Sequence, residues 1–276
     1  MKNPLSKIFR KRAPRQQVEE PAPVAAPAGE PRKEEHLHGI VLHHEEGSNQ
    51  VIFSNLVLHG PDGKPLVEYG DYTLSPGDSM VVSGPAGCGK SAGLAAMRGV
   101  WMLGGSGEIT APPEIRFVPQ EEYFPDRTLR GLISSPDPVS AYTQEQVEKA
   151  MKDAGLGDFI PELDDETKRG EYWKNTLSGG QKNKLGFAGI FLHADKVKVL
   201  IVDEITAALD AKSEGELYPR LLDRMKHGIV ITVAHHASIA PLHNVQAKVE
   251  NGKVNYTRAE PEKKPAPSAK PPKPSP

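Results

Sequence analysis

One glycine-rich segment of eight residues limits what this chain can fold into more than any other feature. The segment is Gly84-Pro85-Ala86-Gly87-Cys88-Gly89-Lys90-Ser91, which fits the pattern G-x-x-x-x-G-K-S. An apolar stretch, residues 79–83, precedes it, and residues 92–98 continue as a helical sequence. In this pattern the glycines let backbone N–H groups turn toward phosphate oxygens at a helix N-terminus. The segment predicts a strand, a phosphate-binding loop and a helix, in that order.

Composition excludes several classes of protein. The formal net charge is −2 over 276 residues, which does not favour nucleic acid as a partner. No apolar run approaches the ~20 residues that cross a bilayer, so we expect no membrane span within this sequence. Cys88 is the only cysteine, which excludes an intrachain disulfide and favours a reducing cytoplasm.

The two ends of the chain differ from its middle. Residues 13–35 are rich in Pro, Ala and Glu, and residues 259–276 are rich in Pro, Lys and Ala, so neither stretch can bury enough apolar surface to fold. The first fifteen residues are basic, which indicates a solvated tail or a short segment that rests on anionic lipid. We expect disordered tails over 1–49 and 259–276, flanking one domain over 50–258.

Several segments of this domain have the character of strands. The apolar runs 197–202 and 229–234 are nearly continuous, as in strands that are buried on both faces of a parallel sheet. Residues 51–58 and 115–118 form two more candidate strands, and Asn251-Gly252 predicts a type I′ hairpin turn near the end of the domain.

Helical segments alternate with these strands. One helix is expected between Thr143, at the start of a capping box, and Gly155. Another is expected between Asp210 and Gly228, with Pro219 kinking or splitting it. This alternation predicts an α/β fold with a parallel core sheet and an antiparallel β edge.

Two acidic residues, Asp203 and Glu204, directly follow the apolar run 197–202. At the carboxyl end of a central parallel strand, such side chains face the phosphate-binding loop. Asp203 would hold Mg²⁺ together with Ser91, and Glu204 would orient or deprotonate an attacking water. Lys90 would reach the β- and γ-phosphates of a nucleoside triphosphate.

A second motif narrows the interpretation to one family. The segment Leu177-Ser178-Gly179-Gly180-Gln181 resembles the signature of the ATP-binding-cassette (ABC) ATPases. Further segments resemble that family's Q-loop (Val118-Pro119-Gln120), D-loop (Ala207-Ala208-Leu209-Asp210) and switch histidine (Val233-Ala234-His235), in the family's order. The resemblance covers about residues 50–250.

The resemblance implies a P-loop NTPase of the ABC ATPase type, with a helical subdomain at about 128–190. It also implies that ATP and Mg²⁺ bind between two copies of the chain, where the signature of one meets the γ-phosphate held by the other. The implied catalytic residues are Lys90, Gln120, Glu204 and His235, and the implied metal ligands are Ser91, Gln120 and Asp203. The implied nucleotide contacts are Gly84, Pro85, Ala86, Gly87, Cys88, Gly89, Lys90, Ser91, Ala92, Ser178, Gly179, Gly180, Gln181 and Asp210. Gly60 stands where the family has an aromatic residue against adenine, so base stacking falls to His59 or is weak.

Finer features are similar to one branch of the family. Residues 117–130 look like its F-L-P-Q-x-P-Y-x-P-x-G-T-L-R segment, and Trp101 and Trp173 fit as well. That branch contains peroxisomal fatty-acyl-CoA transporters and bacterial relatives linked to cobalamin or antimicrobial-peptide uptake. Its members have a membrane domain ahead of the ATPase, where this sequence has the polar residues 1–49. This difference implies that the permease is a separate chain or that another subunit substitutes for it.

The leading hypothesis is therefore the ATP-hydrolysing subunit of an ABC transporter. It would act as a homodimer, or paired with another ABC ATPase, on the inner face of the cell membrane, with a separate permease and without nucleic acid. One alternative is a soluble ABC ATPase that acts on nucleic acid or ribosomes, suggested by the basic N-terminus but disfavoured by the short spacing between loop and signature. A third hypothesis is a nucleotide-dependent interaction module with weak turnover, suggested by Gly60 and the Pro-rich tails.

Overall fold

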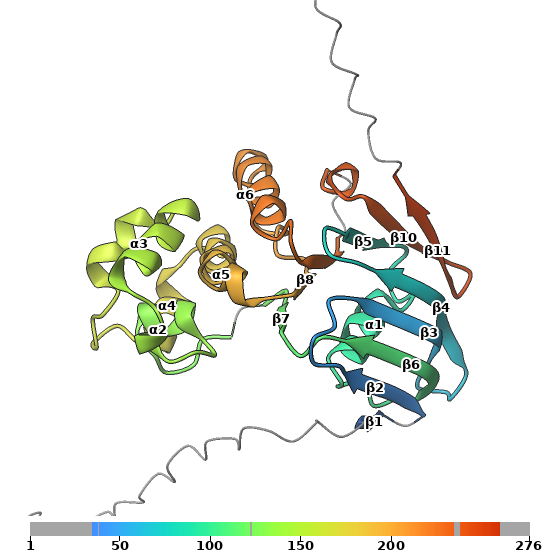
Figure 1. Ribbon diagram of the computed structural model, residues 1–276. Helices are drawn as coiled ribbons and strands as arrows, with labels where there is room; N and C mark the ends of the chain where they lie inside the picture. Colours follow the sequence, from blue (N-terminus) through green and yellow to red (C-terminus); the bar gives the residue numbers. More distant parts are fainter. Residues whose placement is uncertain (1–34, 38, 122, 235–237, 260–276) are drawn as a thin grey trace, which may run out of the picture. The chain divides into compact units, whose positions relative to one another are not determined.

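The computed structural model describes residues 35–37, 39–121, 123–234 and 238–259 (Figure 1). The strands of these residues form one sheet in the order β1-β2-β6-β3-β4-β11-β10-β5-β9-β8-β7. The strands are β1 (Glu35–Leu37), β2 (Ile40–His44), β3 (Val51–His59), β4 (Pro65–Leu74), β5 (Ser79–Ser83), β6 (Gly105–Ala111), β7 (Ile115–Val118), β8 (Val199–Asp203), β9 (Ile229–Val233), β10 (Val245–Glu250) and β11 (Lys253–Arg258). The α-helices are α1 (Lys90–Met97), α2 (Leu129–Ser134), α3 (Gln144–Asp153), α4 (Gly170–Thr176), α5 (Gly179–His193) and α6 (Ala211–Arg224). Short 3₁₀ turns are η1 (Val139–Ala141), η2 (Gly157–Glu162), η3 (Ala194–Lys196) and η4 (Ala240–Leu242).

The core of the sheet is parallel, as the sequence predicts. Strands β10, β5, β9, β8 and β7 lie side by side and run in the same direction. The side chains of β8 divide between the two faces of the sheet. Leu200 and Val202 belong to one buried cluster, whereas Val199 and Ile201 belong to another. Both faces are therefore covered, which explains why the β8 and β9 sequences are almost continuously apolar.

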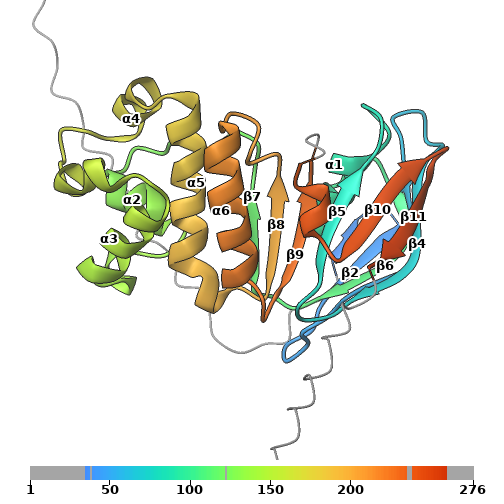
Figure 2. The same cartoon turned by 90° about the horizontal axis from the view of Figure 1, so that it is seen from above.

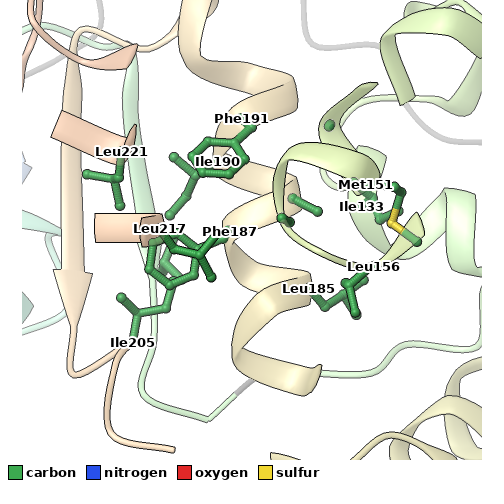
Figure 3. Close-up of a cluster of buried hydrophobic side chains, with 14 of the residues drawn as sticks. Ile133, Met151, Leu156, Leu185, Phe187, Ile190, Phe191, Ile205, Leu217 and Leu221 are labelled. Carbon is green, nitrogen blue, oxygen red and sulfur yellow. The ribbon is translucent and has the colours of Figure 1, made fainter. Parts of the chain in front are cut away.

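Helices cover both faces of this core. On one face, helices α2 to α6 pack around the first cluster, which Figure 3 shows with Phe187 and Ile190 of α5 beside Leu217 of α6. Figure 2 shows α5 and α6 next to β7, β8 and β9. On the other face, α1 contributes Leu94 and Met97 to the second cluster. Helices α2 to α5 lie between residues 129 and 193, where the helical subdomain is expected.

The other half of the sheet contains the antiparallel pairs. Strand β3 pairs antiparallel with β4 and with β6, and β10 pairs antiparallel with β11. The β10–β11 turn is formed by Asn251 and Gly252, whose φ angles are 50° and 76°. Two positive φ angles are what a type I′ turn requires, so the predicted hairpin is confirmed.

The sheet begins earlier than the expected domain start at residue 50. Strand β2 pairs with β6, and the side chains of Ile40 and Leu42 are 0% and 1% exposed. The expectation of a disordered tail therefore does not hold for residues 40–44, because pairing with β6 places the side chains of Ile40 and Leu42 in the core. Most of the two expected tails lies outside the described residues.

The last helix also differs from expectation. Helix α6 runs through Pro219 as one element and ends at Arg224 rather than at Gly228. Pro219 removes the hydrogen bond to the carbonyl of Gly215, four residues earlier. Both residues are exposed, so water can satisfy that carbonyl, and the helix continues past the proline.

Candidate functional site

The phosphate-binding loop connects β5 to α1, as the sequence predicts. Its residues Gly84, Gly87 and Gly89 all have positive φ angles, of 150°, 74° and 103°. Gly89 caps α1 in the left-handed conformation, and a Cβ there would approach the Val67 side chain to 2.6 Å. Only glycine allows this close turn against β4, which leaves the first N–H groups of α1 directed into the loop.

Lys90 lies along the loop. Its ammonium Nζ donates hydrogen bonds of 2.9 Å to the carbonyls of Gly84 and Pro85, and the residue is 6% exposed. The loop therefore holds a positive charge at the N-terminus of α1, where Ser91 is exposed. This arrangement attracts anionic oxygens, because the charge adds to the helix dipole.

A buried tyrosine supports the base of α1. Tyr69 of β4 is 2% exposed, and its hydroxyl lies 3.3 Å from the carbonyl of Gly89 and 3.4 Å from that of Lys90. Burial raises the pKa of Tyr69, so the hydroxyl keeps its proton. Gly93 of α1 lies against this ring, and a Cβ on Gly93 would come within 2.0 Å of the Tyr69 hydroxyl oxygen. Helix α1 can approach β4 this closely because residue 93 lacks a side chain.

Asp203, Glu204 and Gln120 lie at the carboxyl ends of two neighbouring strands. Asp203 ends β8, and Gln120 follows β7, its neighbour in the sheet. The side-chain amide Nε2 of Gln120 donates a 2.9 Å hydrogen bond to Oε2 of Glu204. Glu204 has a φ of 51°, an uncommon conformation for a residue with a side chain. Its N–H donates to the carbonyl of Val233 on β9, which fixes the direction in which its carboxylate leaves the sheet.

The order of the strands brings the phosphate-binding loop, the two acidic residues and Gln120 to the same end of the sheet. Strands β5, β9, β8 and β7 are consecutive and parallel, so the loop after β5, the acids after β8 and Gln120 after β7 leave the sheet at the same end. This is the end at which parallel α/β sheets hold their ligands. His235, the expected switch histidine, follows β9 but lies outside the described residues.

Polar contacts hold the chain on both sides of residues 235–237. Ser238 donates a 3.0 Å hydrogen bond to Glu214 on α6. Tyr218 of α6 contacts Thr232 of β9 at 2.7 Å and Nε2 of His243 at 3.0 Å. These three side chains are at most 4% exposed, and burial lowers the pKa of His243. The network joins α6, β9 and the segment that follows the expected switch position.

The signature segment begins helix α5. Ser178 and Gln181 form a reciprocal capping box, with hydrogen bonds of 3.2 and 2.8 Å to each other's backbone N–H groups. Ser178 and Gly179 are exposed. A Cβ on Gly180 would approach the carbonyl of Ala208 to 3.2 Å, so the D-loop segment packs against this glycine.

Asp210 ends the D-loop segment and caps α6. Its carboxylate accepts hydrogen bonds from the backbone N–H and the hydroxyl of Ser213, and these bonds lower the pKa of Asp210. Within the described ranges, no hydrogen bond joins the signature residues 178–181 to the phosphate-binding loop of the same chain.

A hollow of about 320 Å³ opens beside the phosphate-binding loop. Six residues of the loop and of α1 line it, together with Leu66 and Trp101. No sequence pattern indicates Leu66 as a site residue, and neither His59 nor Gly60 lines this hollow. A larger hollow of about 420 Å³, near Ile115 and His193, contains none of the expected site residues.

Comparison with known proteins agrees with this geometry. The profile of the family described as "ABC transporter" matches residues 68–207, which are 140 of the 276 residues. This chain belongs to the ABC transporter family. It therefore contains an ATP-binding domain of the ABC type, and the family predicted from the signature is confirmed.

Several ABC proteins are similar to this chain. An "Uncharacterized ABC transporter ATP-binding protein" of Haemophilus influenzae is 30% identical over 197 residues, covering 71% of this chain and 32% of that protein. The human "ATP-binding cassette sub-family D member 3" is 29% identical over 219 residues, covering 75% of this chain and 32% of that protein. This chain thus spans about a third of the length of these relatives.

A solved structure has the same fold. The "Structure of a bacterial Atm1-family ABC exporter with ATP bound" matches with a TM-score of 0.64 and 20% identity, covering 76% of this chain and 39% of that one. No helix in the described part of this chain is long and apolar enough to cross a membrane.

The residues expected to hold Mg²⁺ are chemically suited to it. The Ser91 hydroxyl, the Asp203 carboxylate and the Gln120 side-chain carbonyl all supply oxygen atoms, which Mg²⁺ prefers. Among the described residues, no three His, Cys, Asp or Glu side chains gather into a metal site made by protein alone. Such a donor set fits an ion that takes its other ligands from nucleotide phosphates and water.

Proposed function

We propose that this chain is the ATP-hydrolysing subunit of an ABC transporter, that two copies pair around ATP, and that the pairing drives a separate membrane permease. The observation that carries the proposal is the hydrogen bond between Gln120 and Glu204, at the sheet end where Lys90 also lies. It supports a site in which a carboxylate is held next to bound phosphates. The inner face of the cell membrane is where such a subunit would work.

Each residue of the site has a distinct part in hydrolysis. The phosphate-binding loop and Lys90 hold the β- and γ-phosphates, because their N–H groups and ammonium offset the phosphate charge. Ser91, Asp203 and Gln120 would hold Mg²⁺, which when bound would supply positive charge to offset the negative charge on the phosphates. Glu204 accepts a proton from the attacking water, and the amide of Gln120 keeps its carboxylate in place.

The signature loop supports the pairing of two copies. Ser178 and Gly179 are exposed at the N-terminus of the 15-residue helix α5, where backbone N–H groups attract anions. We expect this loop to meet the γ-phosphate held by a second copy. His235 would contact the same phosphate from the first copy.

ATP turnover tests the hydrolytic part of the proposal. Glu204→Gln should keep the shape and the ATP affinity of the site but lower turnover about 10²- to 10⁴-fold. Glu216→Gln, an exposed change on α6, should leave turnover unchanged. ATP with Mg²⁺ should also shift the Glu204→Gln variant to a dimer by light scattering. Unchanged turnover in Glu204→Gln, or a chain that stays monomeric with ATP, would contradict the proposal.

Purification from native membranes tests the transport part. The tagged chain, extracted in mild detergent, should recover a multi-span membrane protein in stoichiometric amounts by mass spectrometry. Recovery of ribosomes or nucleic acid, or of no partner, would instead favour a non-transport ATPase.

A further inference from the structure

The hollow beside the phosphate-binding loop is lined by two chemically different groups of residues. Residues 86, 87 and 89–92 bring the N-terminus of α1 and the cationic Lys90, whereas Leu66 and Trp101 bring apolar side chains. Its volume of about 320 Å³ lies within the range of small-molecule sites. A nucleotide has the same two-part character, since its phosphates are anionic and its base has flat apolar faces.

Trp101 is held in place by the strand pairing of the sheet. Its indole Nε1 donates a 3.0 Å hydrogen bond to the carbonyl of Gly104. The same carbonyl accepts a 3.0 Å hydrogen bond from the backbone N–H of His59 at the end of β3. Trp101 therefore lies beside the turn that the resemblance assigns to adenine stacking, although it comes from the segment after α1.

Trp101 is more buried than the residues on either side of it. Met102 and Leu103 are 65% and 44% exposed, and Val100 is 50% exposed. Trp101 between them is only partly exposed and packs against the cluster that includes α1. Leu66 lies over the start of α1, with its Cγ 3.5 Å from the position of a Cβ on Gly89.

We propose that Trp101 stacks on the base of the bound nucleotide and that Leu66 contacts the same end of the ligand. This inference rests on the proposed ATP binding and adds the residue that holds the base. An aromatic face attracts any nucleobase by stacking, which is worth about tenfold or more in affinity per base. Gly60 then needs no side chain, because the stacking surface is supplied by Trp101.

Affinity for two probes separates base binding from phosphate binding. ATP contains the base, whereas inorganic tripolyphosphate presents phosphates alone. Trp101→Leu, which keeps an apolar side chain in the packing but removes the aromatic face, should weaken ATP binding about tenfold or more. It should leave tripolyphosphate binding unchanged. Trp101→Phe, which keeps an aromatic ring, should lose less ATP affinity than Trp101→Leu.

Intrinsic fluorescence gives a direct second readout. The chain has two tryptophans, and Trp173 is 0% exposed with its Nε1 donating to the carbonyl of Lys168. ATP should therefore change the emission of wild-type protein through Trp101, and Trp101→Phe should abolish that change. Met102→Ala, in the same loop, is the matched control and should retain the wild-type affinities and emission change.

The outcomes distinguish this inference from the proposed function. If ATP binding requires Lys90, as shown by Lys90→Ala, but is the same in Trp101→Leu as in the wild type, the stacking role is wrong and the proposed function stands. Equal losses of ATP and tripolyphosphate binding in Trp101→Leu would also overturn the stacking role. If wild-type protein binds no ATP, the proposed function fails, and the inference fails with it.

Discussion

The contact between Gly93 and Tyr69 predicts a large effect from adding one methyl group. In Gly93→Ala the new Cβ would lie 2.0 Å from the Tyr69 hydroxyl oxygen and 2.4 Å from the ring carbon that carries it. Heavy atoms do not approach this closely, so either helix α1 or the tyrosine must move. The Tyr69 ring has little freedom to move, because the residue is 2% exposed and the ring packs edge-on against Phe53, with 5.9 Å between the two ring centroids.

Two opposing terms set the size of the effect. Overpacking a buried site costs typically about 1–3 kcal/mol, and this clash belongs near the upper end. Alanine is favoured over glycine inside a helix by at most about 1 kcal/mol, which offsets part of that cost. The net loss of unfolding free energy in Gly93→Ala is about 2 kcal/mol. At about 2–4 °C per kcal/mol for a domain of this size, Tm falls by roughly 4–8 °C.

Urea denaturation followed by circular dichroism measures this loss directly. The matched control is Gly215→Ala on α6, where an added Cβ has no atom within 4 Å and the residue is exposed. Gly215→Ala should stabilise the protein by up to about 1 kcal/mol, because only the helix preference remains. If Gly93→Ala proves as stable as the wild type, or if both variants shift in the same direction, the packing argument is wrong.

Three further changes have defined outcomes. Tyr218→Phe removes a hydroxyl that contacts buried Thr232 and His243, so the free energy of unfolding in urea should fall by about 1–3 kcal/mol. Burial lowers the pKa of His243 below its ordinary value of about 6.5, so unfolding takes up a proton and stability is lost as pH falls below that value. The urea midpoint should therefore be lower at pH 5.5 than at pH 7.5, and this difference should be smaller in His243→Gln. Thr128→Ala removes the cap that accepts from the N–H of Gly131 at the start of α2, which should lower the free energy of unfolding by about 1 kcal/mol.

Elements decided by short-range interactions could be predicted from the sequence. The β10–β11 turn depends on Asn251 and Gly252 alone, and Thr143 caps helix α3 in the expected capping box. The loop before α1 depends on the spacing of its own glycines and on Lys90. For the same reason, the residues that gather at the sheet end after β5, β7 and β8 could be named before their contacts were known.

Elements that depend on contacts between distant parts of the chain could not be predicted from the sequence. Strand β6 has a weak strand sequence because it contains Gly105 and Gly107, which are required by its close approach to β3. A Cβ on Gly105 would lie 2.2 Å from the carbonyl of Val57, and one on Gly107 would lie 2.4 Å from that of Asn55. Strand β2 depends in turn on pairing with β6, and no local pattern indicates that pairing.

The position of Trp101 has the same origin. Its place at the hollow follows from Gly104, whose carbonyl joins the loop after α1 to the end of β3. A motif based on neighbouring residues can locate the phosphates of a nucleotide, but not the side chain that meets its base. That side chain is fixed by a strand pairing between distant parts of the chain.

The lengths of the strands at the sheet edges limit how two copies of this protein can associate. Among the described strands, the two at the edges are the shortest, three residues in β1 and four in β7. Short edges offer few unpaired backbone groups to a strand from another molecule. In the proposed pair, the described edges therefore favour contacts through helix ends and loops, which can separate again when the ligand between them changes, over a continuous sheet that would hold the copies together permanently.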